Sequence, residues 1–476
     1  MIFPTRAGLR EILGLAFPII ASMASFTMMG FVDTWMVSLV GTVEVAAAMP
    51  GGIMAFTIVA LPLGMMRCVS TFASQAVGRG DPRVGAVFAW QGIYFGLLFG
   101  LACGVLWPFA PAFFSLFGHE PEVVGLEVEY FHVRLWGMGL SVSIGALTSF
   151  FYGIQRPTIA LVGVLTANLT NVILNYVFIF GNWGAPRLGL TGAALAMVLG
   201  FLAEFVVLLG IFLSASYRKE FSTRLTWRPD WVRTRQLLYI GWPAGVQMAI
   251  DVLGWGLLIV MIVGRFGKEH LAASNIAIQY MMISFMPVMG LSHALSSLVG
   301  RYIGEGRHEA AVQRVREALF ISLVYVGLIG VSFFIFRFSL ISVFSNESLV
   351  IQLGANILLC AVVFQLFDGL SITFFGALRG AGDTHWPAGF TVVALVTVFT
   401  PLSLGSVAYT DLESLGPWLA GTVNGIFLGL GFWWRFAQGS WREINIFAMR
   451  GAGHTKREGT WRKTEGASGI TSPELK

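Results

Sequence analysis

Long apolar stretches separated by short polar turns make up most of this chain. Each stretch is close to the ~20 residues that a helix needs to cross ~30 Å of hydrocarbon. The pattern predicts twelve membrane-spanning helices, near residues 12–40, 46–68, 84–107, 130–152, 158–180, 190–213, 237–263, 271–298, 316–336, 349–376, 386–409 and 416–437. We therefore expect an all-α integral membrane protein.

The two halves of the chain carry similar segments at a nearly constant spacing. Residues 76–81 (AVGRGD) parallel residues 302–307 (YIGEGR), and their first glycines lie 304 − 78 = 226 positions apart. Residues 40–47 and 266–273 repeat the offset, with glycines at 267 − 41 = 226, and Pro18 precedes Pro243 by 225. Six helices repeated in one orientation predict two pseudo-symmetric six-helix bundles with a cavity between them.

Basic residues predict the orientation and the domain boundaries. With both termini in the cytoplasm, the inner loops carry fourteen Arg and Lys residues and the outer loops carry four. That asymmetry is typical of a multi-pass protein of the cell (inner) membrane. We expect an N-terminal lobe at 1–213, a basic cytoplasmic linker at 214–236, a C-terminal lobe at 237–437 and a polar cytoplasmic tail at 438–476.

Composition agrees with the lipid environment. Apolar residues make up 56% of the 476 positions and charged residues 12%, and the mean hydropathy is +0.76. A water-soluble domain needs more charge on its surface. The net charge of +5 does not indicate nucleic-acid binding, because basic residues beside spans are the normal insertion signal and contact lipid headgroups.

Four acidic residues lie well inside predicted spans, namely Asp33, Glu204, Asp251 and Asp368. A carboxylate at the centre of a span costs ~3 kcal/mol on insertion scales, so each needs a structural or functional reason. At an offset of 226, Asp33 maps onto Ile259 and Asp251 maps back onto Ser25. The acids are therefore not placed symmetrically, and we expect the two halves to have specialised separately.

Polar neighbours surround the two acids of the second half. Gln247 precedes Asp251 by one helical turn, Gln365 precedes Asp368 by three residues, and Ser371 follows Asp368 by three. Residues at these spacings share a helical face. Oxygen-rich clusters of this kind suit a hard cation such as sodium, and a carboxylate alone can instead carry a proton.

In the first half, Asn171 and Asn175 lie one turn apart on the predicted fifth helix. Taken alone, this pair is explained equally well as helix–helix hydrogen bonding or as a ligand pair. Two acids in the second half favour function over simple packing.

The chain contains three further motifs, FFGALRGAGDTHWP at residues 374–387, FVDTWM at residues 31–36 and NVILNYVFIFG at residues 171–181. Together they resemble the multidrug and toxic compound extrusion (MATE) family, in its NorM-type branch. Residues 374–387 (FFGALRGAGDTHWP) resemble the family's loop after the tenth helix. Residues 31–36 (FVDTWM) resemble its first-helix aspartate motif, and residues 171–181 (NVILNYVFIFG) its fifth-helix motif, in which Asn175 points to the NorM-type branch. The likeness covers nearly the whole chain and implies two six-helix lobes that alternate in access.

The resemblance also implies a function and its residues. It indicates a secondary active antiporter that exports small cationic or amphiphilic compounds in exchange for sodium ions or protons, with no other cofactor. Cation coupling is carried onto Asp33, Asn171 and Asn175 in the first lobe and onto Asp251 and Asp368 in the second. We expect Asp251 and Asp368 also to hold sodium and, with Gln247 and Gln365, to contact substrate. The partners expected are small molecules, the coupling ion and the lipid bilayer, with the protein acting as a monomer.

Two positions depart from that branch. The seventh-helix acid is usually glutamate, and Asp251 is one methylene shorter. The sixth helix often supplies a threonine to the first-lobe site, where this chain has Met197. Glu204 lies on the same helical face as Met197, and the resemblance assigns it no role.

Two other functions remain open at this stage. Transporters of similar architecture flip lipid-linked oligosaccharides, using several cationic residues for pyrophosphate. The spans here offer Arg67, Arg134 and Arg435. An intramembrane aspartyl protease is the enzymatic alternative, because residues 380–383 (GAGD) fit the short Gly-x-Gly-Asp signature that ends at Asp383.

Overall fold

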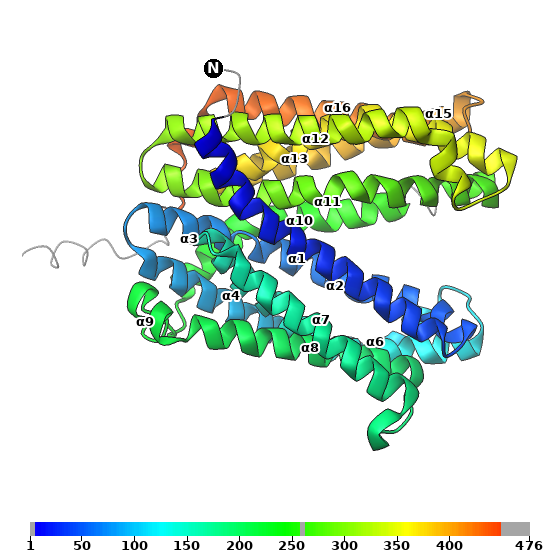
Figure 1. Cartoon of the computed structure of the whole chain (residues 1–476), viewed down its shortest axis with the longest axis horizontal. Coiled ribbons are helices and arrows are strands. Elements are labelled where there is room, and N and C mark those ends of the chain that lie inside the picture. Colours follow the sequence, from blue (N-terminus) through cyan, green and yellow to red (C-terminus); the bar gives the residue numbers. More distant parts are fainter. Residues whose placement is uncertain (1–4, 258–261, 449–476) are drawn as a thin grey trace, which may run out of the picture.

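The structure is a computed structural model that describes residues 5–257 and 262–448. Within those residues it consists of helices and contains no strand. Among the described residues, twelve helices are long and apolar enough to cross a membrane, which confirms the predicted all-α fold. The residues form two helical lobes that lie side by side in Figure 1.

The first lobe contains the helices that precede the linker. They are α1 (Arg6–Ser38), α2 (Thr42–Met66), α3 (Val69–Gly78), α4 (Pro82–Cys103), η1 (Gly104–Phe109), α5 (Ala110–Ser115), α6 (Pro121–Gly153), α7 (Pro157–Phe180), η2 (Asn182–Gly184) and α8 (Gly189–Phe212). The short helix α9 (Ala215–Phe221) lies in the segment predicted as the linker.

The second lobe begins before residue 237. Its elements are α10 (Trp231–Leu257), η4 (Val263–Phe266), α11 (Lys268–Gly304), α12 (His308–Ser342), α13 (Ser348–Ala381), α14 (His385–Ala394), η5 (Leu395–Phe399), α15 (Thr400–Tyr409), α16 (Leu415–Gln438) and η6 (Ser440–Glu443). The predicted tail lies outside the described residues from position 449 onward.

Prolines begin several of these helices, and a glycine ends one of them. Pro82, Pro121 and Pro157 occupy the first positions of α4, α6 and α7, where the missing N–H would be unpaired in any case. Gly181 ends α7 with φ 75°, a left-handed conformation that an L side chain rarely adopts. A Cβ there would also lie 3.0 Å from the backbone nitrogen of Arg187.

Three of the spans in the described part of the chain are interrupted. The span Pro82–Ser115 consists of α4, η1 and α5. The span 42–78 consists of α2 and α3, joined at Arg67 and Cys68. The span His385–Tyr409 consists of α14 and α15, joined by the π-helical turn η5. Single π turns inside α-helices are frequent at functional sites.

Helices α1 and α10 each pack into the core of the opposite lobe. Ile12, Ala16 and Ile19 of α1 belong to a buried cluster built mainly from α11, α12 and α13. Leu237 and Ile240 of α10 belong to the buried cluster of the first lobe. This reciprocal exchange agrees with the pseudo-symmetry expected from the repeat.

Direct contacts between the lobes gather at the end of the molecule where α1 begins and α16 ends (Figure 1). There the Thr71 hydroxyl donates to the Arg379 carbonyl at 2.9 Å, and Gln75 Nε2 donates to the Gly380 carbonyl at 3.1 Å. Gly78 packs so closely on α11 that a Cβ would overlap the Arg301 carbonyl. The lobes are therefore tightly closed at this end, which carries the loops that we predict to be cytoplasmic.

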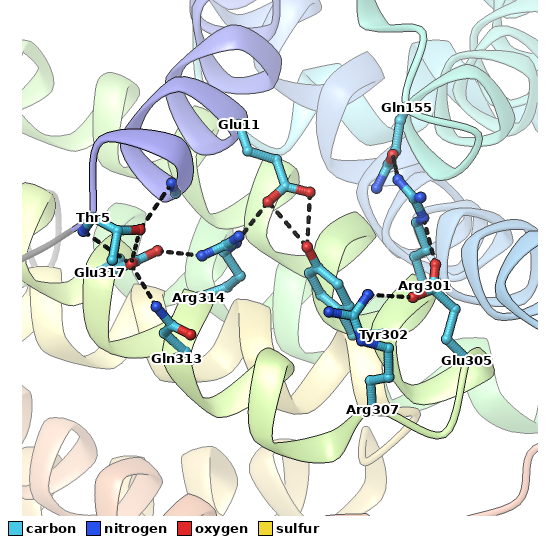
Figure 2. Close-up of polar contacts among 11 residues, drawn as sticks. Thr5, Glu11, Gln155, Arg301, Tyr302, Glu305, Arg307, Gln313, Arg314 and Glu317 are labelled. Atoms are coloured by element: carbon cyan, nitrogen blue, oxygen red, sulfur yellow. Dashed lines mark hydrogen bonds and ion pairs between the residues drawn. The ribbon is translucent and has the colours of Figure 1, made fainter.

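Polar contacts fix the start of α1 to the second lobe, as Figure 2 shows. The Thr5 hydroxyl donates to Glu317 Oε1 at 2.8 Å, and Arg314 Nε donates to Glu11 Oε2 at 2.6 Å. The Tyr302 hydroxyl also donates to Glu11 at 3.0 Å. These bonds anchor α1 to α11 and α12, in addition to its apolar contacts.

One contact in the same view crosses between the lobes. Arg301 Nη1 of α11 donates to Gln155 Oε1 at 2.7 Å, and Gln155 lies in the turn between α6 and α7 of the first lobe. The Arg301 Nε also pairs with Glu305 at 2.8 Å. Arg301 therefore links the two lobes at the closed end, and it also keeps an ion pair with Glu305.

Candidate functional site

The structure brings together the three residues predicted for the first-lobe site. Asn175 Nδ2 donates to Asp33 Oδ1 at 2.5 Å and to Asn171 Oδ1 at 3.2 Å. Both asparagines are fully buried, and Asp33 is half-buried. A carboxylate on α1 is therefore attached to α7 through a chain of amides.

A basic side chain lies near this cluster. Arg134 of α6 interacts electrostatically with Asp33, and its guanidinium carbon lies 5.9 Å from the ring centroid of Phe201. Its Nη1 is buried and has no hydrogen-bond partner within the described part of the chain. The first-lobe acid thus has a fixed positive charge in its surroundings, which sequence reasoning did not connect with it.

Met197 and Glu204 of α8 lie in apolar surroundings. Met197 packs against the first-lobe core, and the Glu204 side chain is 4% exposed. A Cβ on Gly163 of α7 would lie 3.3 Å from Glu204 Cγ. Glu204 therefore sits where α7 and α8 pack closely.

In the second lobe, Asp251 of α10 and Asp368 of α13 line the same cavity, whose volume is about 130 Å³. Three further side chains with oxygen atoms share its wall: Ser371, Thr391 and Asn424. The remaining lining residues are apolar or glycine: Ile250, Gly254, Phe364, Leu395, Phe399, Gly421, Gly425 and Leu428. The two acids predicted as a shared site thus face one space inside the lobe.

The oxygen atoms of the wall are available to a cation. The Thr391 hydroxyl donates to the Pro387 carbonyl at 2.9 Å, which leaves its oxygen lone pairs free to accept. Asn424 Oδ1 is buried and has no hydrogen-bond partner among the described residues. Carboxylate, hydroxyl and amide oxygens together form the donor set that hard cations prefer.

The interrupted span His385–Tyr409 forms part of the cavity wall. Leu395 and Phe399 line it from the two ends of the π turn η5. The Thr400 hydroxyl donates to the Leu395 carbonyl at 2.8 Å. Because a π turn has a wider backbone than an α-helix, it gives this wall an irregular surface next to the two acids.

The two acids are affected by each other's charge and by one charge outside the cavity wall. Asp251 and Asp368 interact electrostatically with each other, and Arg67 at the break between α2 and α3 acts on Asp251. The lining itself contains no Arg or Lys among the residues that the structure describes. A cavity walled by acids attracts cations rather than the pyrophosphate of a lipid-linked sugar.

The two glutamines predicted as substrate contacts are not among the residues that line this cavity. Gln365 is 3% exposed, and its Nε2 donates to the Val326 carbonyl at 3.3 Å. The Oε1 atoms of Gln247 and Gln365 are buried and have no hydrogen-bond partner within the described residues. In this conformation neither amide contributes to the cavity wall.

Sequence reasoning missed Thr391 and Asn424. Asn424 lies in the middle of the last predicted span, so the rule that drew attention to Asn171 and Asn175 could also have found it. Thr391 carries no comparable signal, because threonine is common in membrane helices, where its hydroxyl bonds the preceding turn.

The aspartate of the protease-like signature has a structural partner. Asp383 Oδ2 accepts from Arg435 Nε at 2.8 Å, and the Asp383 side chain is 5% exposed. The guanidinium carbon of Arg435 lies 5.5 Å from the ring centroid of Trp386. The pair joins the turn before α14 to α16.

Across the described residues, no group of three His, Cys, Asp or Glu side chains is placed to hold a metal ion.

Twelve spans in two lobes, with paired acids around a cavity inside the membrane region, define a transporter rather than an enzyme. The chain belongs to the MatE family, whose sequence model matches residues 18–177 and again residues 243–403. The two matches begin 243 − 18 = 225 positions apart, which confirms the repeat predicted from the sequence.

The chain is similar to curated proteins along most of its length. It is 30% identical over 446 residues to a protein of Rhizobium meliloti described as "Probable multidrug resistance protein NorM", with 90% of each chain covered. It is 28% identical over 374 residues to a protein of the same description from Thermotoga maritima, covering 78% of this chain and 79% of that one.

Solved structures share the fold. A structure described as "Crystal structure of MATE in the straight conformation" superposes with a TM-score of 0.82 at 19% identity, covering 93% of this chain and 100% of that one. A second one, described as an outward-facing multidrug resistance MATE family transporter, gives the same TM-score, identity and coverage.

Proposed function

We propose that this protein is a secondary active antiporter that exports small cationic or amphiphilic compounds in exchange for sodium ions or protons. The observation that carries the proposal is that Asp251 and Asp368, from two different helices, line one cavity with Ser371, Thr391 and Asn424. The relatives described as multidrug resistance proteins support drugs and toxins as the cargo.

The coupling mechanism is competition at the two acids. A cationic compound is held by the negative charge of Asp251 and Asp368 and by the apolar wall that includes Phe364 and Phe399. When a sodium ion or proton occupies the carboxylates, that charge is neutralised and the compound leaves. Each charge that falls through ~100 mV supplies about 2.3 kcal/mol, and opposing preferences at one site couple the two fluxes.

Alternating access supplies the movement between the two sides. The direct contacts of α3 with α11 and α13 close one end of the molecule. We place this end in the cytoplasm of a cell whose inner membrane holds the protein, because the basic loops gather there. Binding of a compound from the cytoplasm then requires these contacts to open, and the protein does this as a monomer.

The first-lobe residues complete the proposal. Asp33, Asn171 and Asn175 form a second place for a coupling ion, and movement of α1 relative to α7 changes their hydrogen bonds. The nearby Arg134 offsets the charge of Asp33 when no ion is bound. Gln247 and Gln365 contact substrate in a conformation that turns their unpartnered Oε1 atoms toward the cavity.

The test is efflux of a fluorescent cation from cells or its uptake into everted vesicles, with sodium and pH gradients imposed separately. Asp368→Asn removes the charge and keeps the shape, so it should abolish gradient-driven transport at normal expression. Asp411→Asn is the matched control, because Asp411 is exposed in the loop before α16. Transport at the wild-type level in Asp368→Asn would refute the proposal.

A further inference from the structure

The segment that follows the last span crosses from one lobe to the other. We call residues 439–448 the strap. Gly439 adopts φ 78°, a left-handed conformation that turns the chain away from the axis of α16. In Figure 1 the red strap lies at the closed end of the molecule.

The first half of the strap is anchored in the second lobe. Trp441 is 1% exposed and belongs to the core cluster of α11, α12 and α13. Its ring stacks on Phe436 of α16 at a centroid distance of 5.0 Å, and its Nε1 donates to the Phe436 carbonyl at 2.9 Å. Arg442 adds an ion pair with Glu309 of α12 at 3.2 Å.

The second half of the strap is anchored in the first lobe. Ile446 is fully buried in the first-lobe core. The Phe447 ring lies 5.8 Å from the ring of Phe72, centroid to centroid, and the Arg79 guanidinium carbon lies 4.3 Å from the Phe447 centroid. Arg79 Nη2 also donates to Asn445 Oδ1 at 3.1 Å.

The first-lobe anchor lies next to a close contact between the lobes. Arg79 directly follows Gly78, the α3 glycine that packs on the backbone of α11. The strap has only 445 − 441 = 4 peptide steps between Trp441 and Asn445. A fully extended chain of that length spans at most roughly 14 Å. The lobes therefore cannot move far apart here while both anchors hold.

The first-lobe anchor is the weaker of the two. The first-lobe anchor has one fully buried side chain, Ile446, beside the exposed Asn445 and the half-buried Phe447. The second-lobe anchor buries the larger Trp441 ring within the core. Less buried apolar area means a lower cost of release.

We propose that the strap is a latch: Asn445, Ile446 and Phe447 hold this end of the transporter closed and leave the first lobe each time it opens, while Trp441 stays with the second lobe. The inference rests on alternating access, which is part of the proposed function. It goes beyond that function by assigning a conformational task to residues that contact neither cargo nor coupling ion.

Two cross-links separate the latch from a simple packing role. Cysteines in place of Arg79 and Asn445, joined by a short bis-maleimide, tie the strap to the first lobe and should reduce efflux of the fluorescent cation to the level of empty vesicles. Cysteines in place of Glu309 and Arg442, joined by the same reagent, tie it to the second lobe and should leave efflux unchanged. Wild-type protein treated identically gives the baseline. Any other combination of results overturns the proposal.

A second measurement does not need transport. Spin labels at Arg83 and Arg316, which are exposed on α4 and α12, report the distance between the lobes at the closed end. In Phe447→Ala the ratio of open to closed molecules should rise roughly tenfold. In Glu443→Ala, whose side chain is exposed on the strap, the ratio should not change. An unchanged ratio in Phe447→Ala refutes the latch, whereas absent efflux in the wild type refutes only the proposed function.

Discussion

The two lobes share a fold, but the surroundings of their intramembrane acids differ. In the first lobe, Asp33 is bound by Asn175 near Arg134. In the second lobe, Asp251 and Asp368 line an open cavity. A carboxylate whose hydrogen bonds are already made stabilises the structure around it, whereas two acids that face a cavity repel each other and attract a cation.

The repeat makes this comparison residue by residue. Ser25 is the position equivalent to Asp251, at an offset of 251 − 25 = 226. Its carbonyl accepts from Asn168 Nδ2 at 2.8 Å. The first lobe therefore has a satisfied hydrogen bond where the second lobe has a charge. The duplicated scaffold fixed the helix positions, and the polar residues gave each lobe its own chemistry.

The largest effect is expected when the second-lobe charge is removed. Asp251→Asn should lower ion-driven efflux about 30-fold, equivalent to ~2 kcal/mol, because a charged ligand is replaced by a neutral one. The rate of uptake of the fluorescent cation into everted vesicles at matched expression measures this loss. The comparison fails if Asp33→Asn, made in parallel, costs more transport than Asp251→Asn does.

In the first lobe the larger effect should fall on stability. Asp33→Ala leaves one N–H of the buried Asn175 amide without its acceptor, because only the bond to Asn171 remains, and an unpaired buried donor costs about 1–3 kcal/mol. The thermal unfolding temperature in detergent should therefore drop. Asp368→Ala should shift that temperature less, because Asp368 lines a cavity and its replacement removes a charge that is repelled by Asp251. Equal shifts in the two variants would remove the distinction between the lobes.

Asn424→Leu tests whether sodium is the coupling ion and whether Asn424 binds it. An amide oxygen can bind sodium and does not carry a proton at neutral pH. If sodium drives export, the sodium concentration for half-maximal efflux should rise about tenfold, or ~1.4 kcal/mol. Thr422→Val on the same helix is the matched control, because the Thr422 hydroxyl donates only to the Trp418 carbonyl at 3.0 Å. An unchanged sodium dependence would exclude Asn424 as a ligand.

The smallest effect is expected from the shape of the cavity. A Cβ on Gly425 would lie 3.2 Å from the Phe364 ring, whereas a Cβ on Gly421 would meet only Phe399, at 3.9 Å. Gly425→Ala should therefore lower efflux of bulky compounds about two- to threefold, in line with a strain below ~1 kcal/mol, and Gly421→Ala should not. Competition between a small and a large cation for export measures this size dependence. If Gly425→Ala lowers the export of both cations equally, the prediction is wrong.

The sequence alone determined the number of spans, the repeat and the intramembrane acids. Each of these can be read locally: a span is a continuous apolar stretch, the repeat is a constant offset, and an acid in a span stands out because of its desolvation cost. The family resemblance then connected Asp33 with Asn171 and Asn175, which the structure places in hydrogen-bond contact.

Only the tertiary structure decided which residues share a wall. Thr391 and Asn424 join Asp251 and Asp368 from separate helices, whereas Gln247 and Gln365 are not part of the wall. The exchange of α1 and α10 between the cores and the two anchors of the strap also could not be read from the sequence. The reason is physical: a membrane helix is apolar on nearly every face, so its sequence specifies that it spans the bilayer but hardly how it is rotated against its neighbours.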